Sequence, residues 1–284
     1  MNEGFRAACV IGWPAGHSRS PLIHNYWIRQ HGLTAEYRRE AVPPEKFAEF
    51  IGSWDEQGYV GANVTLPHKE AALKLSEPDD RAEAVGAANT LWLEGGTLRS
   101  TNTDVEGFTD NLDAAVPGWD AGLQSAIVLG AGGAGRAVVF ALLHRGAERV
   151  YVANRTFDRA EAFRARFGDR VHPVRWGEVN GLLAGSQLLA NATSLGMAGQ
   201  PELEINVSDL PPSAVVTDIV YVPLETPLIA AAKKAGMRTA DGLGMLLHQA
   251  VRGFSLWFGV RPEVTPELRA LIEADLKSGA SAEK

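Results

Sequence analysis

A glycine-rich loop near the middle of the chain places the strongest constraint on the fold. The sequence GAGGAG occupies residues 130–135, after an apolar run at 125–129 that is typical of a buried strand and before a helix expected over 136–145. At such a turn Gly130 permits a tight bend, Gly132 lets a pyrophosphate approach bare backbone, and Gly135 lets helix and strand pack closely. The N–H groups of the helix N-terminus attract the anion. The loop therefore predicts a dinucleotide-binding domain.

The residues after the second strand of this domain indicate which dinucleotide it binds. The strand expected at 149–153 ends at Asn154, where NAD-binding folds usually have an acid that binds the ribose hydroxyls. Arg155 supplies a planar cation suited to phosphate, and Arg159 lies one turn further along the same helix face. Thr156 can cap that helix. We therefore expect NADP(H), with both arginines at the 2′-phosphate; the alternative is that they are solvated surface residues.

The composition is that of an ordinary globular protein and argues against several classes of partner. Of the 284 residues, 45% are hydrophobic and 21% are charged, and the net charge of −7 provides no basic surface for nucleic acid. Apolar runs fall short of the roughly 18 residues that a membrane span requires, so we expect a cytoplasmic protein with no membrane partner. Cys9, the only cysteine, is expected to be buried and inert, and no motif spacing suggests a metal site.

Alternating strand and helix patterns predict two α/β domains. Six short apolar segments predict a doubly wound parallel sheet; they lie at 126–129, 149–153, 171–174, 188–191, 215–220 and 237–240. A smaller α/β domain is expected before them, with strands at 7–11, 35–42 and 59–64, a hairpin near 90–98, and helices at 21–30, 44–54 and 67–75. We expect the last helices, 242–259 and 266–277, to return to this domain. The prediction is a discontinuous substrate domain (1–106 and 242–284) and a Rossmann domain (107–241), with a cleft between them.

Two polar clusters follow strands of the first domain. Ser18 and Ser20 lie on a loop that leaves the first strand and could hydrogen-bond a small carboxylate or polyol, although Ser20 could instead be a simple helix cap. Asn63 and Thr65 alternate onto one side of a strand end, and Lys69 falls in the first turn of the next helix. A lysine there is electrostatically unfavourable because the helix N-terminus carries partial positive charge. A solvated lysine is the alternative to a catalytic one.

Two further clusters favour the catalytic interpretation. Asn89 precedes an apolar hairpin and Asp104 follows it, so this carboxylate could face Lys69. The motif DGLGMLLHQ, residues 241–249, begins with a glycine turn and ends in Gln249, which we expect to point back toward the cleft. Helix capping explains the glycines of this motif but leaves the glutamine unexplained.

Together these motifs resemble those of the shikimate dehydrogenase family. The segments GxPxxHSxSP, NVTLPHK, GAANT, NTD, GAGGAGR, NRT and DGLGMLLHQ occur in the family's order and approximate spacing over nearly the whole chain. The resemblance implies a two-domain enzyme that reduces 3-dehydroshikimate to shikimate with NADPH, a step of chorismate and aromatic amino-acid biosynthesis. It also favours a homodimer over a monomer. One departure is Gly135, where many relatives have serine, and it restores the third glycine of the loop.

The resemblance implies roles for individual residues. Lys69 would be the catalytic acid/base and Asp104 its catalytic partner, and hydride delivery to a ketone independently requires a proton donor within about 3 Å of the oxygen. The substrate carboxylate would bind Ser18, Ser20 and Tyr221, and the hydroxyls or reacting oxygen would bind Asn63, Thr65, Asn89, Asp104 and Gln249. The pyrophosphate would contact Gly130, Ala131, Gly132, Gly133 and Ala134; the adenosine phosphate would contact Asn154, Arg155, Thr156 and Arg159; Ile219 and Gly242 would lie near the nicotinamide.

Three alternatives remain at this point. A quinate/shikimate dehydrogenase of the same superfamily often uses NAD, and the missing acid at Asn154 and the paired serines 18 and 20 argue against it. A catalytically silent NADP(H)-sensing module that regulates a partner would not need both Lys69 and Asp104. A folate-linked dehydrogenase of similar shape would lack the serine pair and the NVTLPHK stretch.

Overall fold

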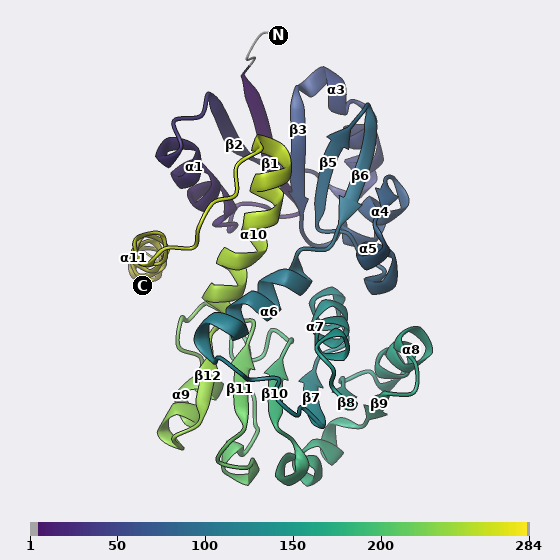
Figure 1. Ribbon diagram of the computed structural model, residues 1–284, viewed down its shortest axis with the longest axis vertical. Coiled ribbons are helices and arrows are strands. Elements are labelled where there is room, and N and C mark those ends of the chain that lie inside the picture. The colour runs from purple at the N-terminus through teal and green to yellow at the C-terminus, as the bar shows by residue number, and fades with distance from the viewer. Residues whose placement is uncertain (1–4, 283–284) are drawn as a thin grey trace. The chain divides into compact units, whose positions relative to one another are not determined.

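The computed structural model describes residues 5–282, which form two compact units (Figure 1). The first unit comprises residues up to Thr103 and from Gln249 onward, and the second runs from Asp104 to His248. Each unit contains its own six-stranded sheet. The predicted fold class, a discontinuous N-terminal α/β domain combined with a parallel-sheet domain, is therefore confirmed.

The sheet of the first unit is mixed, with strand order β2-β1-β3-β5-β6-β4. Its strands are β1 (Arg6–Gly12), β2 (Ala35–Ala41), β3 (Tyr59–Val64), β4 (Glu77–Pro78), β5 (Thr90–Glu94) and β6 (Thr97–Thr101). β1 pairs in parallel with β2 and β3, whereas β5 runs antiparallel to β3 and β6. The continuous apolar run of β1 is buried from Ala7 to Gly12, as expected of a central strand covered on both faces.

Helices of the first unit come from both ends of the chain. They are α1 (Ser20–Gln30), η1 (Pro44–Lys46), α2 (Phe47–Gly52), α3 (Trp54–Gln57), α4 (Lys69–Lys74), α5 (Asp80–Val85) and α11 (Pro266–Ala282), with the later part of α10 (Gly242–Phe258). Trp257 of α10 donates a hydrogen bond to the carbonyl of Leu91, at 2.8 Å. Gly61 makes room for this indole, because a Cβ there would lie 1.9 Å from its Nε1. The later part of α10 and all of α11 therefore belong to the first unit, whereas residues 242–248 belong to the second.

The sheet of the second unit is entirely parallel, with order β12-β11-β10-β7-β8-β9. Its strands are β7 (Ser125–Leu129), β8 (Arg149–Ala153), β9 (Val171–Val174), β10 (Leu188–Asn191), β11 (Val215–Asp218) and β12 (Arg238–Ala240). Its α-helices include α6 (Asp104–Ala115), α7 (Gly133–His144), α8 (Phe157–Phe167) and α9 (Pro227–Lys234). It also contains two 3₁₀ helices, η2 (Trp176–Gly185) and η3 (Val207–Asp209). The strand order reverses between β7 and β10, where ligands of such sheets bind beyond the carboxyl ends.

Two predicted helices differ in detail. The helix expected over 44–54 is split into η1, α2 and α3. At the break between α2 and α3, the hydroxyl of Ser53 donates to the carbonyls of Glu49 and Phe50, both at 3.2 Å. The helix expected from Pro67 begins only at Lys69, since the N–H of His68 closes a turn on the carbonyl of Thr65 at 3.0 Å. Lys69 nevertheless remains in the first turn.

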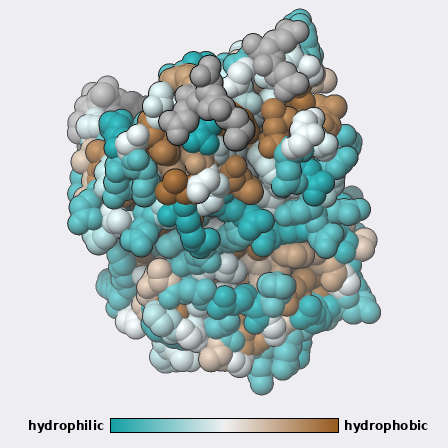
Figure 2. Space-filling view, turned by 45° about the horizontal axis from the view of Figure 1, so that its top comes forward, coloured by the Kyte–Doolittle hydropathy of each residue, from teal (hydrophilic) through white to brown (hydrophobic). Residues whose placement is uncertain are grey.

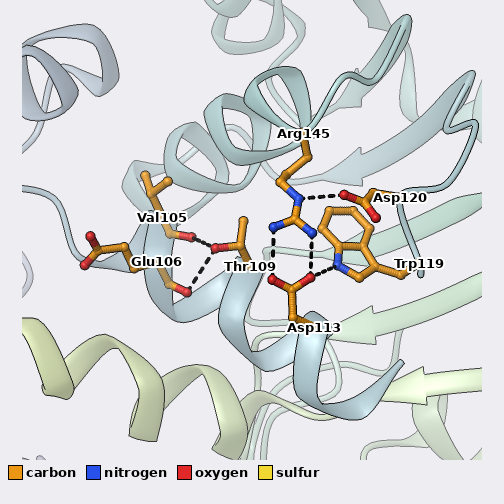
Figure 3. A network of polar contacts seen from close by, with 7 residues as sticks. All are labelled: Val105, Glu106, Thr109, Asp113, Trp119, Asp120 and Arg145. Atoms are coloured by element: carbon orange, nitrogen blue, oxygen red, sulfur yellow. Dashed lines mark hydrogen bonds and ion pairs between the residues drawn. The ribbon is translucent and has the colours of Figure 1, made fainter. Parts of the chain in front are cut away.

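An ion-pair network fastens α6 to the rest of the second unit (Figure 3). Arg145, which ends α7, donates to both carboxylate oxygens of Asp113, at 2.9 and 2.6 Å, and to Asp120 at 2.6 Å. Its guanidinium also lies 5.2 Å from the ring centroid of Trp119, whose indole donates to Asp113 at 2.8 Å. The planar guanidinium thus joins two helices and the loop between α6 and β7.

One face of the surface is largely polar. Figure 2 shows one face on which hydrophilic residues predominate and hydrophobic residues form separate groups. Large hydrophobic residues that are exposed include Phe5, Trp13, Leu66, Leu75 and Met197. Within residues 5–282, no helix has the length and apolar character needed to cross a membrane.

Candidate active site

The three glycines of the central loop serve different purposes. Gly130 has a φ of +107°, and a Cβ there would lie 2.7 Å from the carbonyl oxygen of Ala192. A Cβ at Gly135 would lie 2.2 Å from the carbonyl oxygen of Gly130, whereas one at Gly132 would meet nothing within 4 Å. Helix α7 begins directly after Gly132, which provides no side-chain cap. The fold itself requires Gly130 and Gly135, and Gly132 leaves an open approach to the helix N-terminus.

Asn154 connects this loop to the end of β8. Its Oδ1 accepts a hydrogen bond from the N–H of Ala131 at 3.1 Å, and its Nδ2 donates to the carbonyl of Thr156 at 2.9 Å. These two contacts tie the glycine loop to the first turn of α8. Arg155 and Arg159 are both exposed beside it. Thr156 stands at the N-cap position of α8 as expected, but its side chain makes no capping hydrogen bond.

A buried carboxylate shapes the ends of β10 and β11. Asp218, only 1% exposed, accepts hydrogen bonds from Asn191 Nδ2 at 3.0 Å, Thr226 Oγ1 at 2.7 Å and the N–H of Val220 at 3.0 Å. Burial raises the pKa of Asp218, and these three donors oppose the shift. The sequence analysis assigned Asp218 no role, although an acid at the end of an apolar strand was the available signal.

Asp218 thereby orders the loop that bears two residues of interest. Ile219 and the half-buried Tyr221 follow it directly. A Cβ at Gly242 would lie 2.4 Å from the carbonyl oxygen of Ile219. The structure therefore brings together Ile219 and Gly242, both expected near the nicotinamide.

In the first unit, the backbone of Lys69 is held from two sides. The N–H of Ala88 donates to the Lys69 carbonyl at 2.9 Å, which joins the GAANT segment to the start of α4. His68 lies 2.7 Å from the Val42 carbonyl through Nε2 and stacks on Phe47 at 4.4 Å. Burial lowers the pKa of His68, so the ring remains neutral beside the half-buried Lys69.

A buried hydrogen-bond network joins three of the predicted substrate-binding residues, Asn63, Asn89 and Gln249. Asn63 Nδ2 donates to Thr90 Oγ1 at 3.4 Å, and Thr90 Oγ1 donates to Asn89 Oδ1 at 3.1 Å. Thr103 donates to Asn89 Oδ1 from its N–H at 2.7 Å and contacts Gln249 Oε1 at 3.5 Å. The hydroxyls of Thr90 and Thr103 lie 3.0 Å apart. The sequence analysis singled out neither threonine, although both lie within its motifs.

The serine loop lies beyond the end of β1. Arg39 donates to the Ser18 carbonyl from Nε at 3.1 Å and Nη2 at 2.9 Å, and the N–H of Ser20 donates to Ser18 Oγ at 3.3 Å. Arg19 occupies the N-cap position and Ser20 is the first residue of α1, so the alternative that Ser20 caps the helix is wrong. Thr65, half-buried, approaches Gly12 so closely that a Cβ on that glycine would lie 2.4 Å from its Cγ2.

Asp104 begins α6 immediately after Thr103 and is 8% exposed. It belongs to the second unit and Lys69 to the first. That Asp104 faces Lys69 stays a prediction.

Cys9 is fully buried, and burial raises the pKa of its thiol, which keeps it protonated. Among the residues that the structure describes, no group of three or more His, Cys, Asp or Glu side chains is arranged to hold a metal ion.

Comparison with known proteins matches three family models along the chain. They describe a shikimate dehydrogenase substrate binding domain (residues 10–91), a shikimate/quinate 5-dehydrogenase (118–201) and a shikimate 5′-dehydrogenase C-terminal domain (242–271). A curated relative, the shikimate dehydrogenase (NADP(+)) of Rhodopseudomonas palustris, is 66% identical over 95% of this chain and 97% of its own length.

Solved structures agree with this. The quinate dehydrogenase of Corynebacterium glutamicum in complex with NAD superposes with a TM-score of 0.88 at 31% identity, covering 95% of this chain and 100% of that one. The shikimate 5-dehydrogenase of Thermus thermophilus in complex with NADP(H) and shikimate gives a TM-score of 0.81 at 34% identity, covering 96% of this chain and 98% of the other. This chain belongs to the shikimate dehydrogenase family.

Proposed function

We propose that this protein catalyses the reversible reduction of 3-dehydroshikimate to shikimate with NADPH, a step toward chorismate and the aromatic amino acids. The observation that carries the proposal is the buried network of Asn63, Thr90, Asn89, Thr103 and Gln249 in the same unit as Lys69. A set of amide and hydroxyl groups suits a ring that carries several hydroxyls, because together they offer both donors and acceptors to such a substrate. The 66% identical relative named shikimate dehydrogenase (NADP(+)) supports the same substrate.

Lys69 is the proposed acid/base. When bound, NADPH supplies the hydride that adds to the carbonyl carbon. The Lys69 ammonium donates its proton to the oxygen as negative charge develops there, and in the reverse direction the amine removes the proton from the hydroxyl. Asp104 orients the same part of the substrate. Neither a metal nor a covalent intermediate is needed for this proton balance.

The remaining polar residues bind the rest of the substrate. Ser18 and Ser20 hold the carboxylate together with Tyr221, and Arg39, through its bonds to the Ser18 carbonyl, keeps the serine loop in place. Asn63, Thr65, Asn89 and Gln249 bind the hydroxyls. In this assignment residues 1–106 and 242–284 are the substrate domain, and residues 107–241 are the NADP domain.

On the cofactor side, residues 130–134 bind the pyrophosphate and Arg155 and Arg159 bind the 2′-phosphate. Two exposed guanidinium groups, with no carboxylate at position 154 to repel a phosphate, favour NADP over NAD. Ile219 and Gly242 lie beside the nicotinamide. The cytoplasmic location and the homodimer stay predictions.

Steady-state rates with shikimate and quinate, each with NADP⁺ and NAD⁺, test the proposal. We expect the highest kcat/KM for shikimate with NADP⁺. Quinate turnover comparable to that of shikimate, or a preference for NAD⁺, would instead favour a quinate/shikimate dehydrogenase activity. The fold is also similar to that of a quinate dehydrogenase in complex with NAD. Absence of turnover with all four pairs, with NADP(H) still bound, would favour the silent sensing module.

A further inference from the structure

Tyr37 is a buried residue on the edge strand β2 that reaches the proposed substrate site across a neighbouring strand. In the sheet, β1 separates β2 from β3, which carries Asn63. The hydroxyl of Tyr37, a residue only 3% exposed, nevertheless donates to Asn63 Oδ1 at 2.6 Å. Such a short bond between two buried groups is costly to lose, because the amide oxygen would be left without this donor.

The position of Tyr37 is itself well determined. Asn25 of α1 pairs with the outer edge of β2, where its Nδ2 donates to the Tyr37 carbonyl at 2.9 Å and its Oδ1 accepts from the Tyr37 N–H at 3.0 Å. The phenol ring stacks on His24 with centroids 4.2 Å apart and planes 12° apart. The backbone and the ring of Tyr37 are therefore both held in place, so its hydroxyl can hold the Asn63 side chain in one position.

The contacts with Tyr37 and Thr90 together set the orientation of the Asn63 amide. A side-chain amide can turn by 180°, exchanging its oxygen and nitrogen at little steric cost. With Oδ1 on the Tyr37 hydroxyl and Nδ2 near Thr90 Oγ1 at 3.4 Å, the amide presents N–H groups on the side toward the network. Asn63 then offers a ligand a donor rather than an acceptor.

Both aromatic partners stay uncharged near neutral pH. Burial raises the pKa of Tyr37, and the nearby Asn63 and Ser20 oppose that shift. Burial lowers the pKa of His24 to about 3. The influence of Tyr37 on the site is therefore geometric, and its hydroxyl remains a donor across the working pH range.

We infer that Tyr37 is a positioning residue of this enzyme, whose hydroxyl holds the Asn63 amide with its N–H toward an oxygen of the substrate ring. The inference rests on the proposed function, in which Asn63 binds a substrate hydroxyl. Tyr37 touches no substrate in this account and acts through Asn63, with Ser20 as a second polar neighbour of its hydroxyl.

Tyr37→Phe tests the inference, because it removes one hydroxyl and keeps the stacked ring. We expect the KM for shikimate to rise roughly tenfold, the scale set by an unsatisfied buried amide, with the KM for NADP⁺ and the pH profile of kcat unchanged. Tyr59→Phe is the matched control: Tyr59 is also a buried tyrosine of the first unit, and its hydroxyl bonds Glu40 instead. This control should leave the KM for shikimate unchanged.

A double-mutant cycle with Asn63→Ala distinguishes positioning from packing. If Tyr37 acts through Asn63, Tyr37→Phe adds almost nothing to the KM of the Asn63→Ala enzyme. A full additional increase in that background, or a Tyr37→Phe enzyme that behaves like Tyr59→Phe, would overturn the inference.

A measurement independent of turnover separates this inference from the proposed function. The side-chain amide ¹H–¹⁵N signals of Asn63 in the ligand-free protein should shift in Tyr37→Phe and stay in place in Tyr59→Phe. A wild-type protein that fails to oxidise shikimate would refute the proposed function alone, whereas unshifted Asn63 signals in Tyr37→Phe would refute the role of Tyr37.

Discussion

The two units prepare their sites by different means. In the first unit, side chains do the work: Asn63, Asn89 and Gln249 are joined by two threonine hydroxyls inside the fold. In the second unit, the backbone does it, since the glycine loop leaves N–H groups uncovered at the start of α7. A network of side chains can match one arrangement of hydroxyls, whereas an open backbone turn accepts the pyrophosphate of any dinucleotide. We therefore expect selectivity for the substrate to depend on which side chains line the first unit's site. Cofactor binding should depend on the backbone of the glycine loop, with the charges of Arg155 and Arg159 added.

The largest effect should come from the one residue to which we assign proton transfer. Lys69→Met should lower kcat by about 10²–10⁴-fold, the usual contribution of a positioned acid/base, with little change in the KM for NADP⁺. Lys74→Met, at an exposed position of the same helix, is the control and should retain wild-type rates. Near-normal turnover in Lys69→Met would exclude this residue from the mechanism.

In the second unit, two alanine substitutions should separate fold from cofactor contact. Gly135→Ala places a Cβ 2.2 Å from the Gly130 carbonyl oxygen, and such overpacking costs about 1–3 kcal/mol, which should lower the melting temperature. Gly132→Ala meets nothing in the protein and should leave the melting temperature unchanged while it raises the KM for NADP⁺. Thermal unfolding together with cofactor kinetics checks both. Equal melting temperatures for the two variants would contradict the distinction.

A further effect concerns acid stability of the first unit. His24 is fully buried, and burial lowers its pKa to about 3, with the side chain of Asn63 opposing the shift. Between that value and the ordinary 6.5, the unfolded chain binds a proton that the folded protein does not. The free energy of unfolding should thus fall by up to about 1.4 kcal/mol per pH unit as the pH drops through this window, and level off above it. Denaturant unfolding at several pH values should show a shallower decline in His24→Phe; an identical slope would exclude His24 as the cause.

Local patterns were sufficient to predict most of the fold. All six strands of the second sheet were predicted, and the apolar runs are clearest in the central strands β7, β10 and β11, because a parallel strand covered on both faces leaves a continuous hydrophobic signature. The structure of the crossover between β9 and β10 was harder to predict. There, η2 is a 3₁₀ helix that contains Gly177, Gly181 and Gly185, and glycine has a poor helix propensity.

Contacts between residues far apart along the chain could not be predicted from the sequence. Tyr37 on β2 contacts Asn63 on β3 because the sheet places these strands on either side of β1, close enough for the tyrosine side chain to cross it. Arg145 contacts Asp113 and Asp120 because α6 and α7 are neighbours. No spacing rule relates these positions along the chain. The roles that the motifs assign to residues stay predictions, and the tertiary structure shows which side chains contact those residues.

The claim that one unit binds the substrate and the other selects the cofactor can be tested most directly with Arg155→Ala, assayed with shikimate and both cofactors. The ratio of kcat/KM for NADP⁺ to that for NAD⁺ should fall by roughly tenfold or more, the scale of a lost hydrogen bond to a charged group, while the KM for shikimate stays unchanged. An unchanged NADP⁺ to NAD⁺ ratio, or a rise in the KM for shikimate of the same size, would contradict it.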